Sequence, residues 1–333
     1  MLEPSNFCCP PAKPGVYLTE IMRLDSTIVS LMAQPTYEQQ ALDAAVDRLL
    51  SSSLEWGTLR TARVLLKPNL ITARNGLLAC TDGRFIAAVA RWFAAMGAQV
   101  VVGDSPAFGS ARAVLERINA LSPLQRLGVP VVEFRQVKEI ILPCGHKAAM
   151  AAAVMDCDLL INLPRIKAHS QMRVTLAVKN LFGCLSGFHK PWWHMVHGGN
   201  NGRFAELLVD LLTVLPSGAT LVDGIVAMDQ TGPVHGAPYP LGIIACGDNP
   251  VAIDTGLLAL LGVDPLRSPL WRAAHLAGLG GTNVAELMFP LATPAELAAR
   301  NFVVPEVLGP VRFDPFRFVK NSMKRALLRT LGR

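Results

Sequence analysis

The stretch INLPRIKAHSQMRVTLAVKNLFGCLSGFHKPWWHMVH, residues 161–197, begins inside an apolar run, DLLINLP, at 158–164. Such near-continuous hydrophobic content is typical of a strand that is buried on both faces of a parallel sheet. Lysines, arginines and four histidines follow, without a single aspartate or glutamate. Because an isolated buried cation is costly, this one-sided charge predicts the wall of a site that binds an anion where the strand ends.

Strand-like and helix-like runs alternate outward from this stretch. We expect strands at 63–70, 98–104, 129–134, 158–164, 219–228 and within 241–247. We expect helices at 36–52, 82–97, 110–120, 147–155, 171–183, 203–215 and after Pro250. The alternation predicts an α/β protein with a mainly parallel sheet, helices on both faces, and a ligand cleft at the carboxyl ends of the strands.

The length and composition indicate a globular protein. The chain has 333 residues, of which 51% are hydrophobic and 17% charged, and this excludes a disordered protein. We expect an N-terminal extension with one helix at 1–59, an α/β core at 60–265 and a C-terminal extension at 266–333. The net charge of +6 comes largely from a tail, 317–333, that has six basic residues and no acid. Specific binding of nucleic acid is therefore not expected.

The cysteines and the N-terminal sequence indicate the cellular compartment that we expect for the protein. Seven cysteines are scattered through mostly apolar runs, and no CxxC pair occurs. This pattern favours free thiols in a reducing cytoplasm, with no iron–sulfur cluster on this chain. There is no apolar core of a signal peptide and no uninterrupted apolar run of about 18 residues. We therefore expect a soluble cytoplasmic protein.

Polar residues follow five of the predicted strands and supply the candidate site. The candidate catalytic residues are Lys167, His169 and Lys179. The candidate metal ligands are Asp104, Asp223 and Asp254. The candidate substrate-binding residues are Lys67, Asn69, Ser105, Asn180, Lys190, His194 and Gly232. Lysine can hold an anion or act as a base, and carboxylates can hold a divalent ion. The alternatives are turn formers, capping aspartates and solvated lysines.

The ordered motifs LLKPNL, VVVGDSP, INLPRIKAH, TLAVKNLFG, VDGIVAMDQTGP and GDNPVAIDTGLLALLG resemble the uncharacterised family called domain of unknown function 362. The resemblance covers about residues 60–265 and implies an α/β fold without a settled activity. Many members of that family look redox-associated because a ferredoxin-type domain is attached. This chain lacks such a cysteine set, so an iron–sulfur role would require a partner protein.

Two hypotheses for the function stay open. The first is an enzyme that binds a small carboxylate or phosphate in a cleft lined by Lys, His and Asp, with or without a divalent metal. The second is a non-catalytic carrier or maturation factor for a cofactor or metal, working with a redox partner. The tail at 317–333 has apolar residues at spacings of three and four opposite a basic face. It could contact an anionic membrane, a partner or its own domain.

Overall fold

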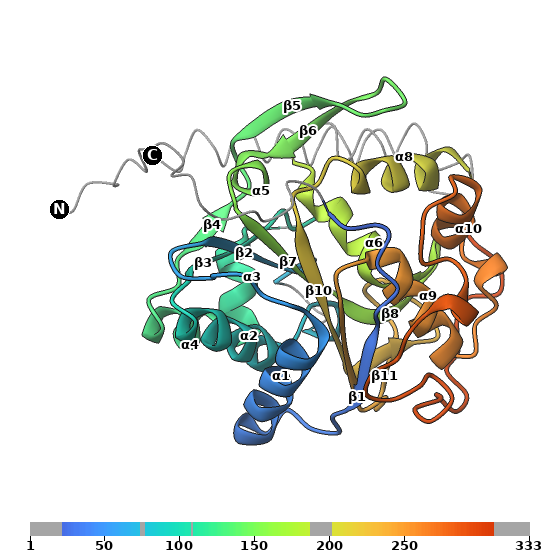
Figure 1. Ribbon diagram of the computed structural model, residues 1–333, viewed down its shortest axis with the longest axis horizontal. Coiled ribbons are helices and arrows are strands. Elements are labelled where there is room, and N and C mark those ends of the chain that lie inside the picture. The colour runs from blue at the N-terminus through green and yellow to red at the C-terminus, as the bar shows by residue number, and fades with distance from the viewer. Residues whose placement is uncertain (1–21, 74–76, 108, 187–201, 310–333) are drawn as a thin grey trace.

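The computed structural model describes residues 22–73, 77–107, 109–186 and 202–309, and a mixed, mainly parallel β-sheet runs through its centre (Figure 1). The main path of the sheet follows the order β1-β12-β10-β7-β2-β3-β4. Its strands are β1 (Ser30–Ala33), β2 (Arg63–Pro68), β3 (Gln99–Asp104), β4 (Val131–Glu133), β7 (Leu159–Leu163), β10 (Gly218–Asp229) and β12 (Ile243–Gly247). β8 (Arg165–His169), β9 (Arg173–Thr175) and β11 (Ala237–Tyr239) extend it beside β10.

The parallel part of the sheet confirms the predicted fold class. β7 lies between β10 and β2, β3 lies beside β2, and β4 lies beside β3, all in parallel register. β12 and β1 then add two antiparallel strands at one edge. The carboxyl ends of β2, β3 and β7 therefore lie next to one another, which is where open α/β sheets place ligands.

Helices cover both faces of the sheet (Figure 1). One layer contains α1 (Gln39–Ser53), α2 (Gly83–Ala95), α3 (Ala111–Arg117) and α4 (Leu121–Arg126). The other contains α6 (Ala177–Leu181), α8 (Arg203–Leu212), α9 (Pro250–Leu260) and α10 (Pro269–Leu276). Short turns complete the described chain at α5 (Ala152–Met155), η1 (Leu77–Ala79), η2 (Phe182–Cys184), η3 (Pro265–Arg267) and η4 (Val284–Glu286).

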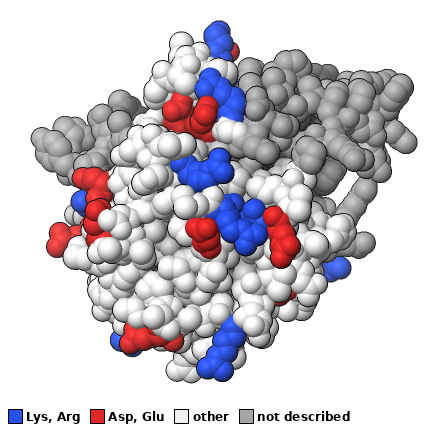
Figure 2. Space-filling view, turned by 90° about the vertical axis from the view of Figure 1, so that its right-hand side faces the viewer, with Lys and Arg blue, Asp and Glu red and all other residues white. Residues whose placement is uncertain are grey.

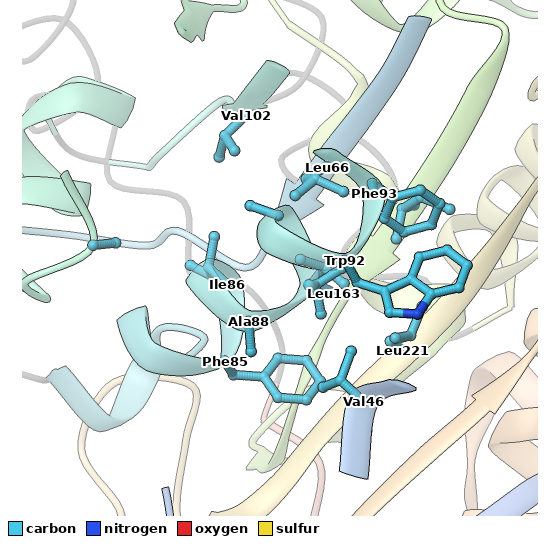
Figure 3. Packing of buried hydrophobic residues seen from close by; sticks show 14 of the residues in the cluster. Val46, Leu66, Phe85, Ile86, Ala88, Trp92, Phe93, Val102, Leu163 and Leu221 are labelled. Carbon is cyan, nitrogen blue, oxygen red and sulfur yellow. The ribbon is translucent and has the colours of Figure 1, made fainter. Parts of the chain in front are cut away.

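Side-chain alternation along β2 decides which layer each residue meets. Val64 and Leu66 pack with Phe85 and Phe93 of α2 in the first layer, and Figure 3 shows this core around Leu66 and Leu163. Leu65 belongs to the opposite core, with Phe204 of α8. Because alternate residues of a strand point to the same face, Lys67 follows Leu65 toward α6. The side chain of Lys67 therefore lies buried at the carboxyl end of β2, on the same face of the sheet as Leu65.

Two predicted helices differ from the structure. Residues 147–155 form β6 (Lys147–Ala151) before the single turn α5, because β6 pairs with β5 (Val137–Ile141) in a hairpin. Residues 171–183 form β9, which pairs with β8, before α6 begins. Long-range strand pairing overrode the helical propensity of both segments. The expected N-terminal extension contains, besides its helix, the strand β1.

None of the helices in the described part of the chain is both long enough and apolar enough to span a bilayer. Five of the cysteines lie in this part, and all five are free thiols: Cys80, Cys144, Cys157, Cys184 and Cys246. Cys80, Cys184 and Cys246 are buried, whereas Cys144 is exposed.

Candidate functional site

A connected set of buried polar side chains lies at the carboxyl ends of β2, β3, β7 and β8. We call it the lysine–asparagine network. Its members are Lys67, Asn69, Asp104, Asn162, Lys167 and Asn180. Five of the six are predicted site residues, so the structure brings much of the predicted constellation together. Lys67, Lys167 and Asn162 are 0% exposed.

Lys67 and Asp104 form the ion pair of the network. The distance from Lys67 Nζ to Asp104 Oδ1 is 2.9 Å, and Lys67 also donates to the Pro68 carbonyl. The other carboxylate oxygen, Asp104 Oδ2, accepts from the Leu70 amide at 2.8 Å. Gly183 closes over this pair, since a Cβ there would lie 2.5 Å from both Lys67 Nζ and Asp104 Oδ1. A glycine is therefore required for the backbone to approach so closely.

Three asparagine side chains link head to tail across the network. Asn69 Nδ2 donates to Asn180 Oδ1 at 2.6 Å, and Asn180 Nδ2 donates to Asn162 Oδ1 at 2.8 Å. Asn162 Nδ2 in turn donates to the Ala177 carbonyl and to Thr220 Oγ1. Because each amide accepts from one neighbour and donates to the next, the three dipoles align and reinforce one another.

Lys167 stands at the oxygen end of this chain of amides. Its Nζ donates to Asn69 Oδ1 at 2.6 Å and to the Ala79 carbonyl, both of which are neutral acceptors. Burial, together with the smaller effects of the nearby Arg165 and Lys67, lowers the pKa of Lys167 to about 7, although Cys80 and Asp104 act in the opposite direction. The amine therefore exchanges its proton near neutral pH, which suits a general acid or base.

Asp223 belongs to a separate cluster at the start of α2, which we call the Asp223 cluster: Tyr37, Asp82, Arg165 and Asp223. The Tyr37 hydroxyl donates to Asp223 Oδ1 at 2.6 Å, and the Asp82 amide donates to Asp223 Oδ2 at 2.9 Å. Arg165 Nε lies 3.9 Å from Asp223 Oδ2. Burial raises the pKa of Asp223, and Arg165 opposes that rise. Both carboxylate oxygens of Asp223 thus already accept hydrogen bonds from groups that belong to the fold.

Asp254 has a third environment, on α9. Its Oδ1 accepts from the Ala177 amide at 2.7 Å, at the beginning of α6. Burial raises its pKa to about 8, so the carboxyl is largely protonated at neutral pH. The three predicted metal ligands thus have three different sets of partners. Among the described residues, no three His, Cys, Asp or Glu side chains gather to hold a metal ion, so the three-aspartate site has no counterpart there.

The remaining predicted residues lie around the network. Lys179 Nζ lies over the rings of Phe182, at 4.6 Å, and Phe204, at 5.4 Å, and makes cation–π contacts there. Thr175 lies in β9 and not in the helix expected at 171–183. His169 Nδ1 accepts from two backbone amides, those of Gln171 and Met172.

Ser105 and Gly232 contact backbone carbonyls. Ser105 Oγ donates to the carbonyls of Gly183 and Leu185, which fixes the turn over the ion pair. A Cβ at Gly232 would lie 1.9 Å from the Ala168 carbonyl oxygen, so this glycine allows its loop to pass close to β8. Lys190 and His194 lie outside the described residues.

Asn162 was missed by the sequence analysis. It lies inside the apolar run LLINL of β7, on the same face as Leu160. The signal was available: an asparagine inside a strand buried on both faces needs hydrogen-bond partners, and these must come from a polar network.

The positive charge of the network is internal rather than a property of the surface. Figure 2 shows the face of the molecule that carries α10, where basic and acidic side chains lie intermixed. A surface groove of about 340 Å³ lies between α8 and α10, lined by residues that include Arg203, Asp210 and Arg272. That groove contains none of the predicted site residues.

Comparison with known proteins gives a matching family, a relative that is similar in sequence, and solved structures with a similar fold. Residues 64–259 match the family described as Domain of unknown function (DUF362). Thylakoid-associated protein sll1697 of Synechocystis sp. is 39% identical over 305 residues, which cover 90% of this chain and 95% of that protein.

Two solved structures are similar at low identity. The lactate racemase apoprotein from Thermoanaerobacterium thermosaccharolyticum is 15% identical, with a TM-score of 0.42 over 60% of this chain and 51% of that chain. A protein from Thermotoga maritima is 10% identical, with a TM-score of 0.40 over 62% of this chain and 56% of that chain. The match thus spans little more than half of each solved chain.

Proposed function

This chain belongs to the DUF362 family, and we propose that it is an enzyme that binds a small anionic molecule, a carboxylate or a phosphate, at the lysine–asparagine network. The observation that carries the proposal is the charge balance of the network. Lys67 and Lys167 are both fully buried, whereas Asp104 is the single carboxylate among the six members and pairs with Lys67. A buried cation without its own counter-ion favours an anionic partner.

The same geometry supports proton transfer. Within the described part of the chain, the hydrogen-bond acceptors of Lys167 are neutral oxygens, and its pKa of about 7 lets it give or take a proton near neutral pH. Lys67, by contrast, forms an ion pair with Asp104 and serves in this proposal as the fixed electrostatic anchor. The proposed division of labour is therefore an anchor at Lys67 and an acid–base group at Lys167.

Thermal unfolding with added anions tests binding. Inorganic phosphate, acetate and lactate should be titrated against the wild-type protein and against Lys167→Met. A ligand at 100 times its dissociation constant stabilises a folded protein by about 2.7 kcal/mol, so a binding anion raises the unfolding temperature measurably. Lys167→Met should lose that increase, whereas Lys147→Met, which changes an exposed lysine of the β5–β6 hairpin, should keep it. Equal increases in all three proteins would contradict the proposal.

The non-catalytic carrier is the other reading of the same site. Metal analysis and mass spectrometry of the purified protein distinguish the two readings. A retained metallocofactor, together with an absence of turnover on carboxylate and phosphate compounds, would favour the carrier with a redox partner. A protein that is purified empty and converts an added anion would favour the enzyme.

A second candidate function is association with an anionic membrane surface through residues 317–333. Two observations favour it: the tail has six basic residues and no acid, and a 39% identical relative is named a thylakoid-associated protein. Basic segments with an apolar face bind such surfaces. Vesicles containing phosphatidylglycerol should sediment the full chain and leave a 317–333 deletion in solution. Equal sedimentation of both proteins would remove this candidate.

A further inference from the structure

Thr175 has a hydroxyl without a hydrogen-bond partner. Its side chain is 2% exposed, and Oγ1 has no acceptor or donor among the described residues. A buried hydroxyl without a partner loses its bonds to water and gains nothing in return, so such groups are uncommon in folded proteins. The Thr175 hydroxyl therefore either gains its hydrogen-bond partner from a bound ligand or is kept without one for the packing of its methyl group.

The strand register places this hydroxyl beside the network. β8 and β9 pair antiparallel, with Lys167 directly opposite Thr175. Residues that face each other in an antiparallel pair point to the same side, with their Cβ atoms about 5 Å apart. The alternate residues Ile166, Val174 and Leu176 pack into the core under α9. Lys167 and Thr175 therefore share the other face, on which Lys167 reaches Asn69.

The Lys167 amine can make one more hydrogen bond than the two found among the described residues. Its Nζ donates to two acceptors, Asn69 Oδ1 and the Ala79 carbonyl. A protonated amine has three hydrogens, and a neutral amine has two hydrogens and a lone pair. One direction thus stays available in either state, and the Thr175 hydroxyl lies on the same face of the strand pair.

We infer that Thr175 is a ligand-binding residue, and that its hydroxyl and the Lys167 amine together hold one oxygen of the bound anion. The inference rests on the proposed function and deepens it by assigning the contact that the anion makes. An anionic oxygen accepts hydrogen bonds from a hydroxyl and an ammonium at once, and such charge-assisted bonds are short and strong. A carboxylate and a phosphate both supply that oxygen.

The substitution Thr175→Val tests the assignment because valine has the same shape and lacks the hydroxyl. Calorimetric titration with inorganic phosphate and with lactate, combined with thermal unfolding, gives two independent readouts. We expect at least a tenfold loss of affinity for the anion that binds, with an unfolding temperature equal to or above that of the wild type. Thr175→Ser should restore the affinity, because it returns the hydroxyl.

Ser30→Ala is the matched control. Ser30 Oγ is the other buried hydroxyl without a partner in the described part of the chain, and it lies in β1, away from the network. Its removal should leave anion affinity unchanged. If the wild type binds an anion and Thr175→Val binds it equally well, the inference fails and the proposed function stands. If the wild type binds neither anion, the proposed function fails and the inference fails with it.

Discussion

Arg165 and Lys167 are two residues apart on β8, and both are buried, yet their surroundings differ in kind. Arg165 donates to the Val226 and Cys80 carbonyls and contacts Tyr37, and its cluster contains the carboxylate of Asp223. Lys167 has two neutral acceptors and faces a hydroxyl without a partner. Among the described residues, β8 thus carries Arg165 with a carboxylate beside it and, two residues later on the same face, Lys167, which makes no ion pair.

The difference separates a structural role from a functional one. A buried charge with a complete set of partners stabilises the fold only while every partner is present. A buried amine with a pKa near neutrality and without a carboxylate of its own is retained at a cost, and functional sites are where such groups occur. The Asp223 cluster should therefore control stability, whereas the lysine–asparagine network should control binding.

The largest effect is expected from Arg165→Met. Without the guanidinium, Asp223 stays buried without a cation, and three further acceptors lose their donor. Breaking a buried pair in this way costs ~3–5 kcal/mol of folding free energy. Urea unfolding measures the loss, and Arg165→Lys should recover part of it because the charge returns without the planar fork. A loss below ~1 kcal/mol would show that the two clusters do not differ as described.

Gly183→Ala should have the next largest effect. The new methyl group would overlap Lys67 Nζ and Asp104 Oδ1, so the ion pair must shift. Overpacking of this kind costs ~1–3 kcal/mol. The same change should also weaken anion binding, because it displaces the anchor lysine. Gly128→Ala offers a contrast, since nothing lies within 4 Å of a Cβ there and only its positive φ is strained.

Asp254→Asn should change how stability depends on pH. In the folded protein the pKa of Asp254 is raised to about 8, so the folded state binds this proton more tightly than the unfolded chain does. The wild type then loses stability as pH rises from about 4 to 8, by up to ~1.4 kcal/mol per pH unit from this group. In Asp254→Asn that loss should disappear. Parallel pH profiles for the two proteins would show that Asp254 is ionised in the folded state.

Lys167→Met should change the opposite side of the profile. Here the folded pKa of about 7 lies below the unfolded value of about 10.4, so the unfolded chain binds the proton more tightly above neutrality. The wild type gains stability from this group as pH rises above about 7, by at most ~1.4 kcal/mol per pH unit. The substitution should remove that gain. Unfolding at pH 6, 7.5 and 9 measures it, and an unchanged profile would place the lysine proton outside this range.

Most of the sheet could be predicted because its strands are continuous apolar runs. β2, β3, β7 and β10 lie where hydrophobic content and strand-ending glycines, prolines and asparagines predict them. β6 and β9 could not be predicted in the same way. Lys147–Ala151 is rich in alanine, and Val174 and Thr175 lie in a segment with helical spacing, so their strand state depends on partners elsewhere in the chain.

The site could be predicted in part for a related reason. Lys67, Asn69, Asp104, Lys167 and Asn180 lie just after apolar elements, and parallel strands bring such positions together. Asp223 and Asp254 also follow apolar residues, yet each accepts a hydrogen bond from a backbone amide that is distant in the sequence, that of Asp82 and that of Ala177. Asn162 was missed because it lies within the apolar run of β7 and not in a polar segment that follows a strand.

The antiparallel edge of the sheet has a consequence for how the chain reaches this state. β1 (Ser30–Ala33) pairs with β12 (Ile243–Gly247), and Val29 donates to the carbonyl of Met288. During synthesis, the first strand must wait for its partner until about two hundred further residues have been made. Contacts so distant in sequence slow folding, because the entropy of closing a long loop is lost before the contact forms. The nascent chain therefore carries β1 unpaired until β12 has been made, and only then can this edge of the sheet form.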